Sequence, residues 1–425
     1  MRKRFDRCAL VHLVKIMAVA QFDKPDGSGL IVIDDSRFPV DSNRHDGKPP
    51  VRVGRLVYAA AHIVMKDSYQ SSFTTDEGGT GTADLWEQID WDTTMACRRH
   101  LAGQGFGIAE AMDTAQRFEV GWQVALELIR RTSKLNLPLG FVAGASTDHL
   151  DAIQSPQDLI DGVVYQISTI QRYGGIPVIL PLPWLTINNK GETTYLEIYG
   201  EIIRQSQGPI ILHWLGEMFL PSLRGYFPGD SFERIMAVDP GKVIGAKISL
   251  LDVEREQQLR QRFLRNEQIL LTGDDWHFVE LIAGNQSAAE RWRSVGPTDV
   301  ALGDFSHALL GIFDGIATPA RAALLQLEAG NVEEYFNIMR PCERLSQIIF
   351  ETPTQHYKTG LAFLSWLNGY QDNRLLPYGA EQHRSSDHLL RVTEAAARAG
   401  ALTDAPLAVD RLNSWLAAPR KRSGH

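Results

Sequence analysis

From residue 56 onward, the sequence alternates short apolar runs with longer amphipathic stretches, and this alternation constrains the fold more than any other feature. The longer stretches have apolar residues at three- and four-residue spacing, which is typical of helices buried on one face. Strands and helices in strict alternation predict parallel strands joined by helical crossovers. The predicted strands are Leu56–Val64, Gly105–Ala109, Leu139–Gly144, Pro177–Pro181, Pro209–His213, Lys242–Ser249, Gln268–Thr272 and an eighth within 299–315.

Eight such units predict an α/β fold of the closed (β/α)8 TIM barrel type, and an open doubly wound sheet is the rival. No GxGxxG motif follows the first strand, which weakens a dinucleotide-binding version of that rival. Either Val300–Gly303 or Ala308–Phe313 could form the eighth strand. We favour Ala308–Phe313, because the following FDGIATPARAALLQLEAG then runs straight into a helix and residues 285–299 become an insertion.

The patterning divides the chain into three parts. Residues 1–55 form an N-terminal extension, in which GLIVIDDSRFPVD predicts a small hairpin or a barrel lid. Residues 56–317 form the barrel. Residues 318–425 contain helical patterns only, and we expect them to form a C-terminal helical region packed on the barrel.

Composition narrows the possible partners. The net charge of −8 argues against a nucleic-acid or anionic-membrane partner, and no run approaches the ~20 apolar residues that span a bilayer. The basic, partly apolar start could suggest a secretion signal, but His12 and Lys15 interrupt its apolar run. The three cysteines lie too far apart for a zinc or disulfide motif. We therefore expect a cytoplasmic protein with an ordinary or misassigned N-terminus, and no cofactor.

The stretch VIGAKISL places a lysine, Lys247, in a strand that otherwise looks buried. Alternation along the strand gives Lys247 the face of Val243, Gly245 and Ser249, and gives the helix-packed face to Ile244, Ala246, Ile248 and Leu250. In a barrel, Lys247 then projects inward near the C-terminal mouth, where barrel enzymes keep their catalytic groups. Burial there lowers the lysine pKa and makes the amine a nucleophile suited to Schiff-base chemistry. The alternative is a lysine that reaches solvent or pairs with Asp274 or Asp275.

The run VIGAKISLLD, followed by ILLTGDDWHFVELIAG and then a helical stretch that begins ALLQLEAGNVEEYF, resembles the dihydrodipicolinate synthase / N-acetylneuraminate lyase superfamily. LPLGFVAGAST resembles the third strand of that family. The likeness covers roughly residues 55 to 370 and implies a class I aldolase-type barrel in which Lys247 is the Schiff-base lysine. It also implies a homodimer or homotetramer that acts on a small carbonyl substrate.

The sequence departs from the family in three places. His213 stands where the family has a proton-relaying tyrosine, and histidine is a competent acid and base near pH 7. GFGIAE lacks the hydroxyl residues with which the family holds a pyruvoyl carboxylate. Leu182-Pro183-Trp184 replaces its paired tyrosines. The departures indicate an outlying branch with retained lysine chemistry and a rebuilt pocket.

Other polar and aromatic residues follow predicted strands and are candidates for substrate binding, although each could instead be a structural residue. Trp184 and Trp214 could stack against a sugar-like substrate. The carboxylates and the histidine could bind substrate hydroxyl groups or move protons. The full set of substrate-binding candidates is His62, Glu110, Trp184, Trp214, Asp274 and Asp275.

The leading hypothesis is therefore a lysine-dependent aldolase or lyase in which Lys247 is the nucleophile and His213 assists. One alternative is a metal-assisted hydrolase or isomerase that uses His62, His213, Asp274 and His277, although no HxH or HExxH pair supports it. Another is a barrel that binds a small molecule without turning it over.

Overall fold

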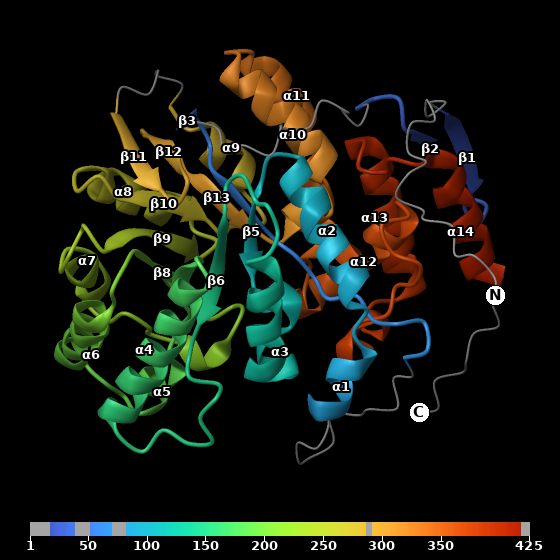
Figure 1. Cartoon of the computed structure of the whole chain (residues 1–425). Coiled ribbons are helices and arrows are strands. Elements are labelled where there is room, and N and C mark those ends of the chain that lie inside the picture. Colours follow the sequence, from blue (N-terminus) through green and yellow to red (C-terminus); the bar gives the residue numbers. More distant parts are fainter. Residues whose placement is uncertain (1–17, 39–51, 70–81, 286–290, 418–425) are drawn as a thin grey trace.

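The computed structural model of the protein describes residues 18–38, 52–69, 82–285 and 291–417. Eight parallel strands close a barrel in the order β10-β13-β4-β5-β6-β7-β8-β9, which confirms the predicted TIM barrel (Figure 1). Seven strands lie where the apolar runs predicted them. The eighth coincides with Ala308–Phe313 rather than with Val300–Gly303. The barrel strands are β4 (Val57–Ala60), β5 (Gly107–Glu110), β6 (Phe141–Ala145), β7 (Ile176–Ile179), β8 (Ile210–Leu215), β9 (Val243–Ser249), β10 (Ile269–Thr272) and β13 (His307–Leu310).

Helices surround this barrel, and short polar residues fix where several of them begin. Ser155 and Asp158 form a capping box at the start of α4, and Asp90 and Asp252 cap α2 and α8. The helices that follow or flank the strands are α1 (Thr82–Gln88), α2 (Trp91–Gly103), α3 (Arg117–Thr132), α4 (Pro156–Arg172), α5 (Pro183–Ile187), α6 (Glu192–Gln205), α7 (Ser231–Met236), α8 (Val253–Leu264), α9 (Phe278–Ala283) and α10 (Ala317–Glu328). None of the described helices is long and apolar enough to cross a bilayer.

A small three-stranded sheet covers the N-terminal end of the barrel. It consists of β11 (Arg291–Val295), β12 (Thr298–Leu302) and β3 (Arg52–Val53). Val295, Val300 and Leu302 are buried with the side chains that fill the barrel interior. The predicted insertion at 285–299 thus contributes a hairpin that closes the bottom of the barrel, and Val300–Gly303 belongs largely to this hairpin.

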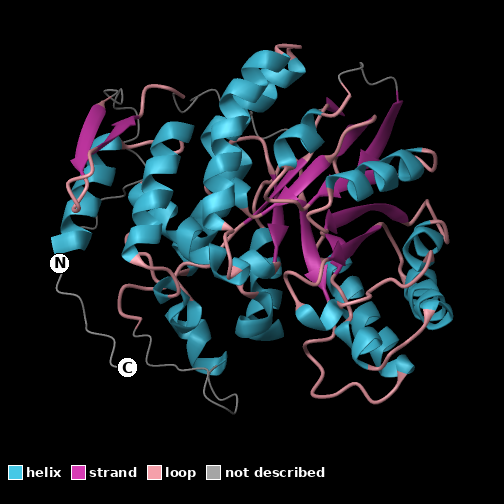
Figure 2. Ribbon diagram, turned by 180° about the vertical axis from the view of Figure 1, so that it is seen from behind, coloured by secondary structure: helices cyan, strands magenta, loops and turns pink. Residues whose placement is uncertain are grey.

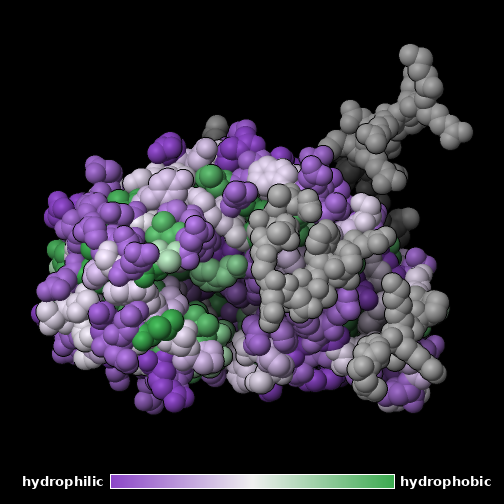
Figure 3. Space-filling model, turned by 90° about the horizontal axis from the view of Figure 1, so that it is seen from below, coloured by the Kyte–Doolittle hydropathy of each residue, from purple (hydrophilic) through white to green (hydrophobic). Residues whose placement is uncertain are grey.

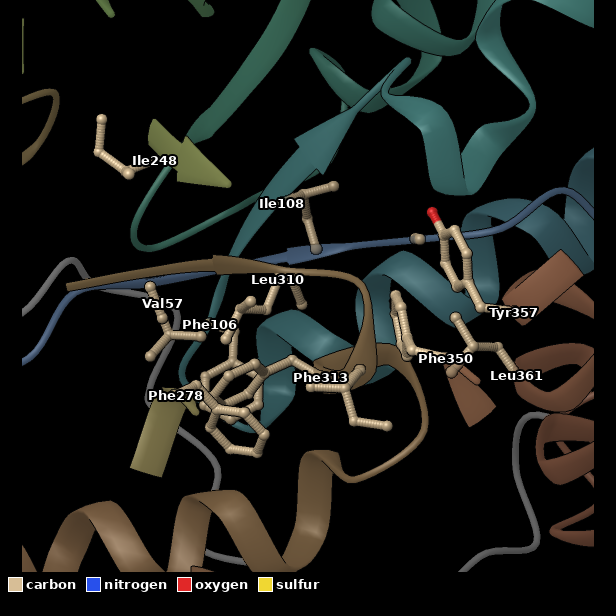
Figure 4. Packing of buried hydrophobic residues seen from close by; sticks show 14 of the residues in the cluster. Val57, Phe106, Ile108, Ile248, Phe278, Leu310, Phe313, Phe350, Tyr357 and Leu361 are labelled. Carbon is tan, nitrogen blue, oxygen red and sulfur yellow. The ribbon is translucent and has the colours of Figure 1, made fainter. Parts of the chain in front are cut away.

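The C-terminal region forms a helical layer beside the barrel, as the sequence predicted (Figures 1 and 2). Its helices are α11 (Val332–Ile349), α12 (Tyr357–Leu367), α13 (Ser386–Ala399) and α14 (Ala405–Ala417), with short 3₁₀ segments η5 (Thr354–His356) and η6 (Pro377–Gln382) between them. The rings of Phe106, Phe278 and Phe313 pack together between the barrel wall and the helices outside it (Figure 4).

The N-terminal hairpin of β1 (Val19–Asp23) and β2 (Leu30–Asp34) packs against α14 and α13. Phe22 is buried there, and Lys24 forms a 2.8 Å ion pair with Glu394. The hairpin interpretation is therefore confirmed, whereas the lid interpretation is wrong for the described residues, because none of them lines the mouth cavity described below. The prediction made for the start of the chain concerns residues 1–17, which lie outside the described ranges.

A β-bulge in β9 corrects one part of the predicted alternation. Ile210 pairs with Val243 and Ile211 pairs with Gly245, so β9 has one extra residue at this point. Ile244 consequently lies with the interior side chains, and Val243 lies with those that pack on the helices, which reverses the predicted faces of these two residues. The expected alternation holds beyond the bulge, where Ala246 and Ile248 pack outward.

Candidate active site

A cavity of about 160 Å³ lies at the C-terminal mouth of the barrel. Side chains from β8, β9 and the turn after β10 line it, together with residues from the turn after β5 and from the C-terminal region. Its volume corresponds to on the order of ten water molecules, which is enough for a small metabolite. This end of a barrel is where catalytic groups collect in enzymes of this architecture.

Lys247, on β9, lines the cavity and is half-buried. Gly273 makes room for it, because a Cβ at position 273 would lie 2.7 Å from Lys247 Cε and 2.1 Å from Ser249 Oγ. Burial lowers the pKa of the Lys247 ammonium group, although the carboxylates of Asp275 and Asp113 oppose that shift. The amine therefore loses its proton more readily than an exposed lysine, as a nucleophile must.

Asp275 lies beside Lys247 and also lines the cavity. Its Oδ1 accepts a 3.1 Å hydrogen bond from the backbone N–H of Ile312, and its carbonyl accepts one from Ser346. Burial raises the pKa of the Asp275 carboxyl, and the hydrogen bond from Ile312 and the charge of Lys247 compensate only in part. Asp275 can thus hold a proton at higher pH than an ordinary aspartate, which suits it to general acid–base work.

His213, on β8, faces the cavity beside Ser249. Its Nε2 lies 3.2 Å from Ser249 Oγ, whereas its buried Nδ1 has no hydrogen-bond partner. Burial first, and then the charge of Lys247, lower the His213 pKa well below its usual value. His213 is therefore a neutral imidazole among the residues that line the cavity.

Several cavity residues come from outside the predicted strands. Asp113 and Thr114 belong to the turn η2 (Asp113–Ala115) after β5, and Gln355, Phe350 and Tyr357 come from the C-terminal region. Thr114 Oγ1 lies 2.8 Å from the hydroxyl of Tyr357, whose ring stacks on Phe350 at 4.3 Å (Figure 4).

Thr114 corrects the expectation that the second strand carries no hydroxyl residue into the site. The stretch GFGIAE ends at Glu110, and the hydroxyl of Thr114 lies four residues further along the chain. The run Asp113-Thr114-Ala115 directly after the strand was the available signal. Nothing near position 357 marked Tyr357, because it is 243 residues from its partner Thr114 in the sequence.

Glu110 and His62 lie outside the cavity, because they point away from the barrel interior. Arg98 binds both carboxylate oxygens of Glu110 at 2.7 and 2.8 Å, and both residues are fully buried. His62 contacts Asp314 through Nδ1 at 2.5 Å and Gln371 through Nε2 at 2.6 Å. These two predicted substrate-binding residues hold the barrel to the surrounding helices instead.

The two tryptophans also lie away from the cavity lining. Trp214 packs its ring 4.6 Å from that of Phe232 on α7. Trp184, on α5, donates from Nε1 to the carbonyl of Ile153 at 3.2 Å. Both pack loops and helices onto the outside of the barrel, since neither residue is among those that line the cavity.

Asp274 is buried next to Asp275 but turns away from the cavity. Its Oδ1 accepts hydrogen bonds from the N–H groups of Trp276 and His277, and its Oδ2 lies 2.8 Å from His277 Nδ1. The two aspartates of the Gly-Asp-Asp motif thus have different positions. Asp274 binds the backbone and side chain of the turn that follows, and Asp275 faces Lys247.

The residues of the metal alternative do not assemble into one site. His62 pairs with Asp314, His277 pairs with Asp274, and His213 lies in the cavity. Across the described ranges, no group of three or more His, Cys, Asp or Glu side chains is arranged to hold a metal ion.

The surface seen from below is mostly hydrophilic, and its hydrophobic residues form small separate patches (Figure 3). Phe118, which lines the cavity, is 57% exposed and marks an apolar rim at its mouth.

Comparison with solved structures shows the same barrel. N-acetylneuraminate lyase from Fusobacterium nucleatum aligns with a TM-score of 0.56 and 12% identity over 80% of this chain and 97% of that one. Sialic acid aldolase from Ruminococcus gnavus aligns with a TM-score of 0.56 and 14% identity over 82% of this chain and 97% of that one. Dihydrodipicolinate synthase from Oceanobacillus iheyensis aligns with a TM-score of 0.54 and 15% identity over 85% of this chain and 97% of that one. The predicted resemblance to this superfamily is confirmed at the level of the fold.

Sequence comparison gives a narrower placement. No curated protein matches the chain significantly. One family model matches residues 36–419, a span that takes in the barrel and nearly all of the C-terminal helical region. The chain belongs to the family described as "Protein of unknown function (DUF993)".

Proposed function

We propose that the protein is a lyase of the class I aldolase type, in which Lys247 forms a Schiff base with a small carbonyl substrate. The observation that carries the proposal is a half-buried primary amine of lowered pKa in a cavity at the barrel mouth. The shared fold supports it, because two of the solved structures described above are named as a lyase and an aldolase.

The chemistry begins when the neutral amine of Lys247 attacks the carbonyl carbon. The resulting carbinolamine loses its hydroxyl as water, which requires a proton donor, and leaves a protonated imine on Lys247. The imine then draws electrons from the adjacent carbon–carbon bond, so that this bond can break or form. Hydrolysis of the imine returns the free amine.

Asp275 is the best-placed proton donor for the dehydration, since its pKa is raised and it faces Lys247. His213 has too low a pKa to carry a proton at rest, so we assign it a positioning role through the contact of its Nε2 with Ser249 Oγ. The linked hydroxyls of Thr114 and Tyr357 provide a second place at which a proton can be relayed.

The test is reductive trapping. The protein is incubated with a panel of small aldehydes, ketones and keto acids in the presence of borohydride, which reduces an imine to a stable secondary amine. Peptide mass spectrometry then locates the adduct. We expect it on the Lys247 peptide with at least one compound of the panel.

The matched control uses the neighbouring lysine. Lys242 lies at the opposite end of β9, where its Nζ binds the carbonyls of Ile203 and Arg204. Lys242→Met should retain the Lys247 adduct, and Lys247→Met should lose it completely. Adducts on other lysines but none on Lys247 would contradict the proposal.

A further inference from the structure

The wall of the cavity opposite Lys247 is mostly apolar. The strands β5 and β9 lie four positions apart around the eight-stranded barrel, so they face each other across its mouth. Met112 follows β5 and Leu180 follows β7, and both line the cavity while they are buried with the side chains that fill the barrel. Leu215, at the end of β8, continues this apolar wall.

The polar side chains that the segment after β5 contributes to this wall already have partners. The carboxylate of Asp113 lies 3.0 Å from the Lys358 ammonium group, and the hydroxyl of Thr114 lies 2.8 Å from that of Tyr357. The end of the cavity near Lys247 is therefore polar, whereas the opposite wall offers mainly hydrocarbon surface. Small-molecule sites commonly combine apolar walls with a few placed polar groups in this way.

Two phenylalanine rings line the cavity without packing against other rings. Phe118, at the start of α3, is 57% exposed, and Phe219, in the loop after β8, is half-buried. Within the described residues, neither ring contacts another aromatic ring and neither belongs to a hydrophobic cluster. By contrast, Phe350 and Tyr357 line the same cavity and stack on each other at 4.3 Å. Apolar rings left open to water beside a cavity provide surface that an apolar group of a ligand can cover.

The cavity is also larger than a carbonyl group needs. Its volume of about 160 Å³ has room for roughly ten water molecules, and therefore for about ten non-hydrogen atoms of a ligand. Acetone would leave more than half of this space unfilled, whereas a methyl ketone that carries a phenyl group would occupy nearly all of it. Such a group would also displace water from the two phenylalanine rings, which favours binding.

We infer that the carbonyl substrate carries an apolar substituent of about the size of a phenyl ring, and that Phe118 and Phe219 are the residues that bind this substituent. The inference rests on the proposed Schiff-base function of Lys247. It goes further than that function in naming the class of carbonyl compound that the cavity accepts.

Three ketones test the inference. Acetone and benzylacetone are both methyl ketones and differ by an added benzyl group, and erythrulose is a ketone whose substituents carry hydroxyl groups instead. Each is trapped on Lys247 with borohydride, and each rate is divided by the rate with a free lysine derivative to remove intrinsic reactivity. We expect benzylacetone to label Lys247 roughly tenfold faster than either of the others, because it alone buries apolar surface against the rings.

Two variants locate the cause. Phe118→Ala and Phe219→Ala should each lower the ratio of the benzylacetone rate to the acetone rate by about three- to tenfold. Because Phe118 is largely exposed, its replacement should not disturb folding. Tyr165→Ala is the matched control, since it removes a 48% exposed ring on α4 that does not line the cavity, and it should leave the ratio unchanged.

The outcomes separate the inference from the function on which it rests. Normalised labelling by acetone or erythrulose as fast as by benzylacetone would overturn the inference and leave the Schiff-base function intact. A rate ratio that is unchanged in both phenylalanine variants would overturn the assignment of these residues. Absence of any label on Lys247, with these ketones and with the wider panel above, would overturn both.

Discussion

Two groups of charged residues follow the barrel strands, and they differ in whether their hydrogen-bonding capacity is used. After β4 and at the end of β5, His62 and Glu110 are fully buried, and Arg98 of α2 binds the carboxylate of Glu110 and the backbone carbonyl of His62. His62 also contacts Asp314. After β8 to β10, Lys247 and His213 face a cavity, and a buried nitrogen of His213 has no partner. The first group therefore has a structural role. The second group presents polar side chains to a cavity that a ligand can enter.

The physical difference lies in direction rather than in residue type. Ala109 points into the barrel, so the next residue, Glu110, must point outward toward α2 and α3. Lys247 and His213 lie on the inward face of their strands. Proximity to the mouth of a barrel is thus insufficient to identify a catalytic residue, and the face of the strand decides.

The largest expected effect is a loss of protein stability in the variant Arg98→Met. Arg98 binds both Glu110 oxygens and donates to the carbonyl of His62 at 2.7 Å. Its removal leaves the Glu110 carboxylate buried without a counter-ion, which costs roughly 3–5 kcal/mol of the free energy of unfolding. Urea denaturation measures the change.

Arg234→Met is the matched control, because Arg234 forms a 2.8 Å pair with Glu192 whose arginine is 59% exposed. We expect little change in stability there. An Arg98 variant as stable as the Arg234 variant would show that the buried pair does not have this structural role.

Gly273→Ala should have the next largest effect. It acts on the cavity group, which contains Lys247 and His213. The added Cβ would collide with Lys247 Cε and Ser249 Oγ, so the amine must move from its position in the cavity. We expect the rate of reductive trapping on Lys247 to fall by about 10- to 100-fold, in keeping with a displacement of about 1 Å.

Gly200→Ala controls for the loss of glycine itself. Gly200 lies in α6 with no atom within 4 Å of the added Cβ, so this change should leave trapping unaffected and favour the helix. Equal trapping in the two alanine variants would mean that Gly273 does not position Lys247.

The sequence was sufficient to predict the barrel, because alternating strand and helix patterns depend on local periodicity. It also predicted the cavity-facing side of Lys247, since a period of two holds along most of β9. It failed at Val243 and Ile244, where a bulge adds one residue and shifts the period. No periodicity reveals a bulge, because it arises from the pairing with a neighbouring strand.

The candidate site was predicted in part. Lys247, His213 and Asp275 lie together, but Trp184, Trp214, His62, Glu110 and Asp274 do not line the cavity. The alternation that placed Lys247 would also have turned Glu110 and Trp214 outward. Tyr357 and Gln355 could not have been found in this way, because tertiary packing of the C-terminal region brings them to the mouth.

The smallest expected effect is a shift in pH dependence, and it tests whether Asp275 and Lys247 act as a pair. Trapping requires the neutral amine, so its rate should rise with pH through the Lys247 pKa, which burial lowers below the ordinary lysine value of about 10.4. The charge of Asp275 raises that pKa. Asp275→Asn removes this charge and should move the midpoint of the profile to lower pH by about one unit.

Asp274→Asn, at the adjacent position outside the cavity, should move the midpoint less, because the charge of Asp274 acts on Asp275 and not directly on Lys247. The midpoint belongs to the coupled pair rather than to Lys247 alone, so the shift between variants is more informative than its absolute value. An unchanged midpoint in Asp275→Asn would mean that Asp275 does not act on Lys247 and has a structural role, as Glu110 does. Thr114 and Tyr357 would then be the candidates for the proton donor of the dehydration.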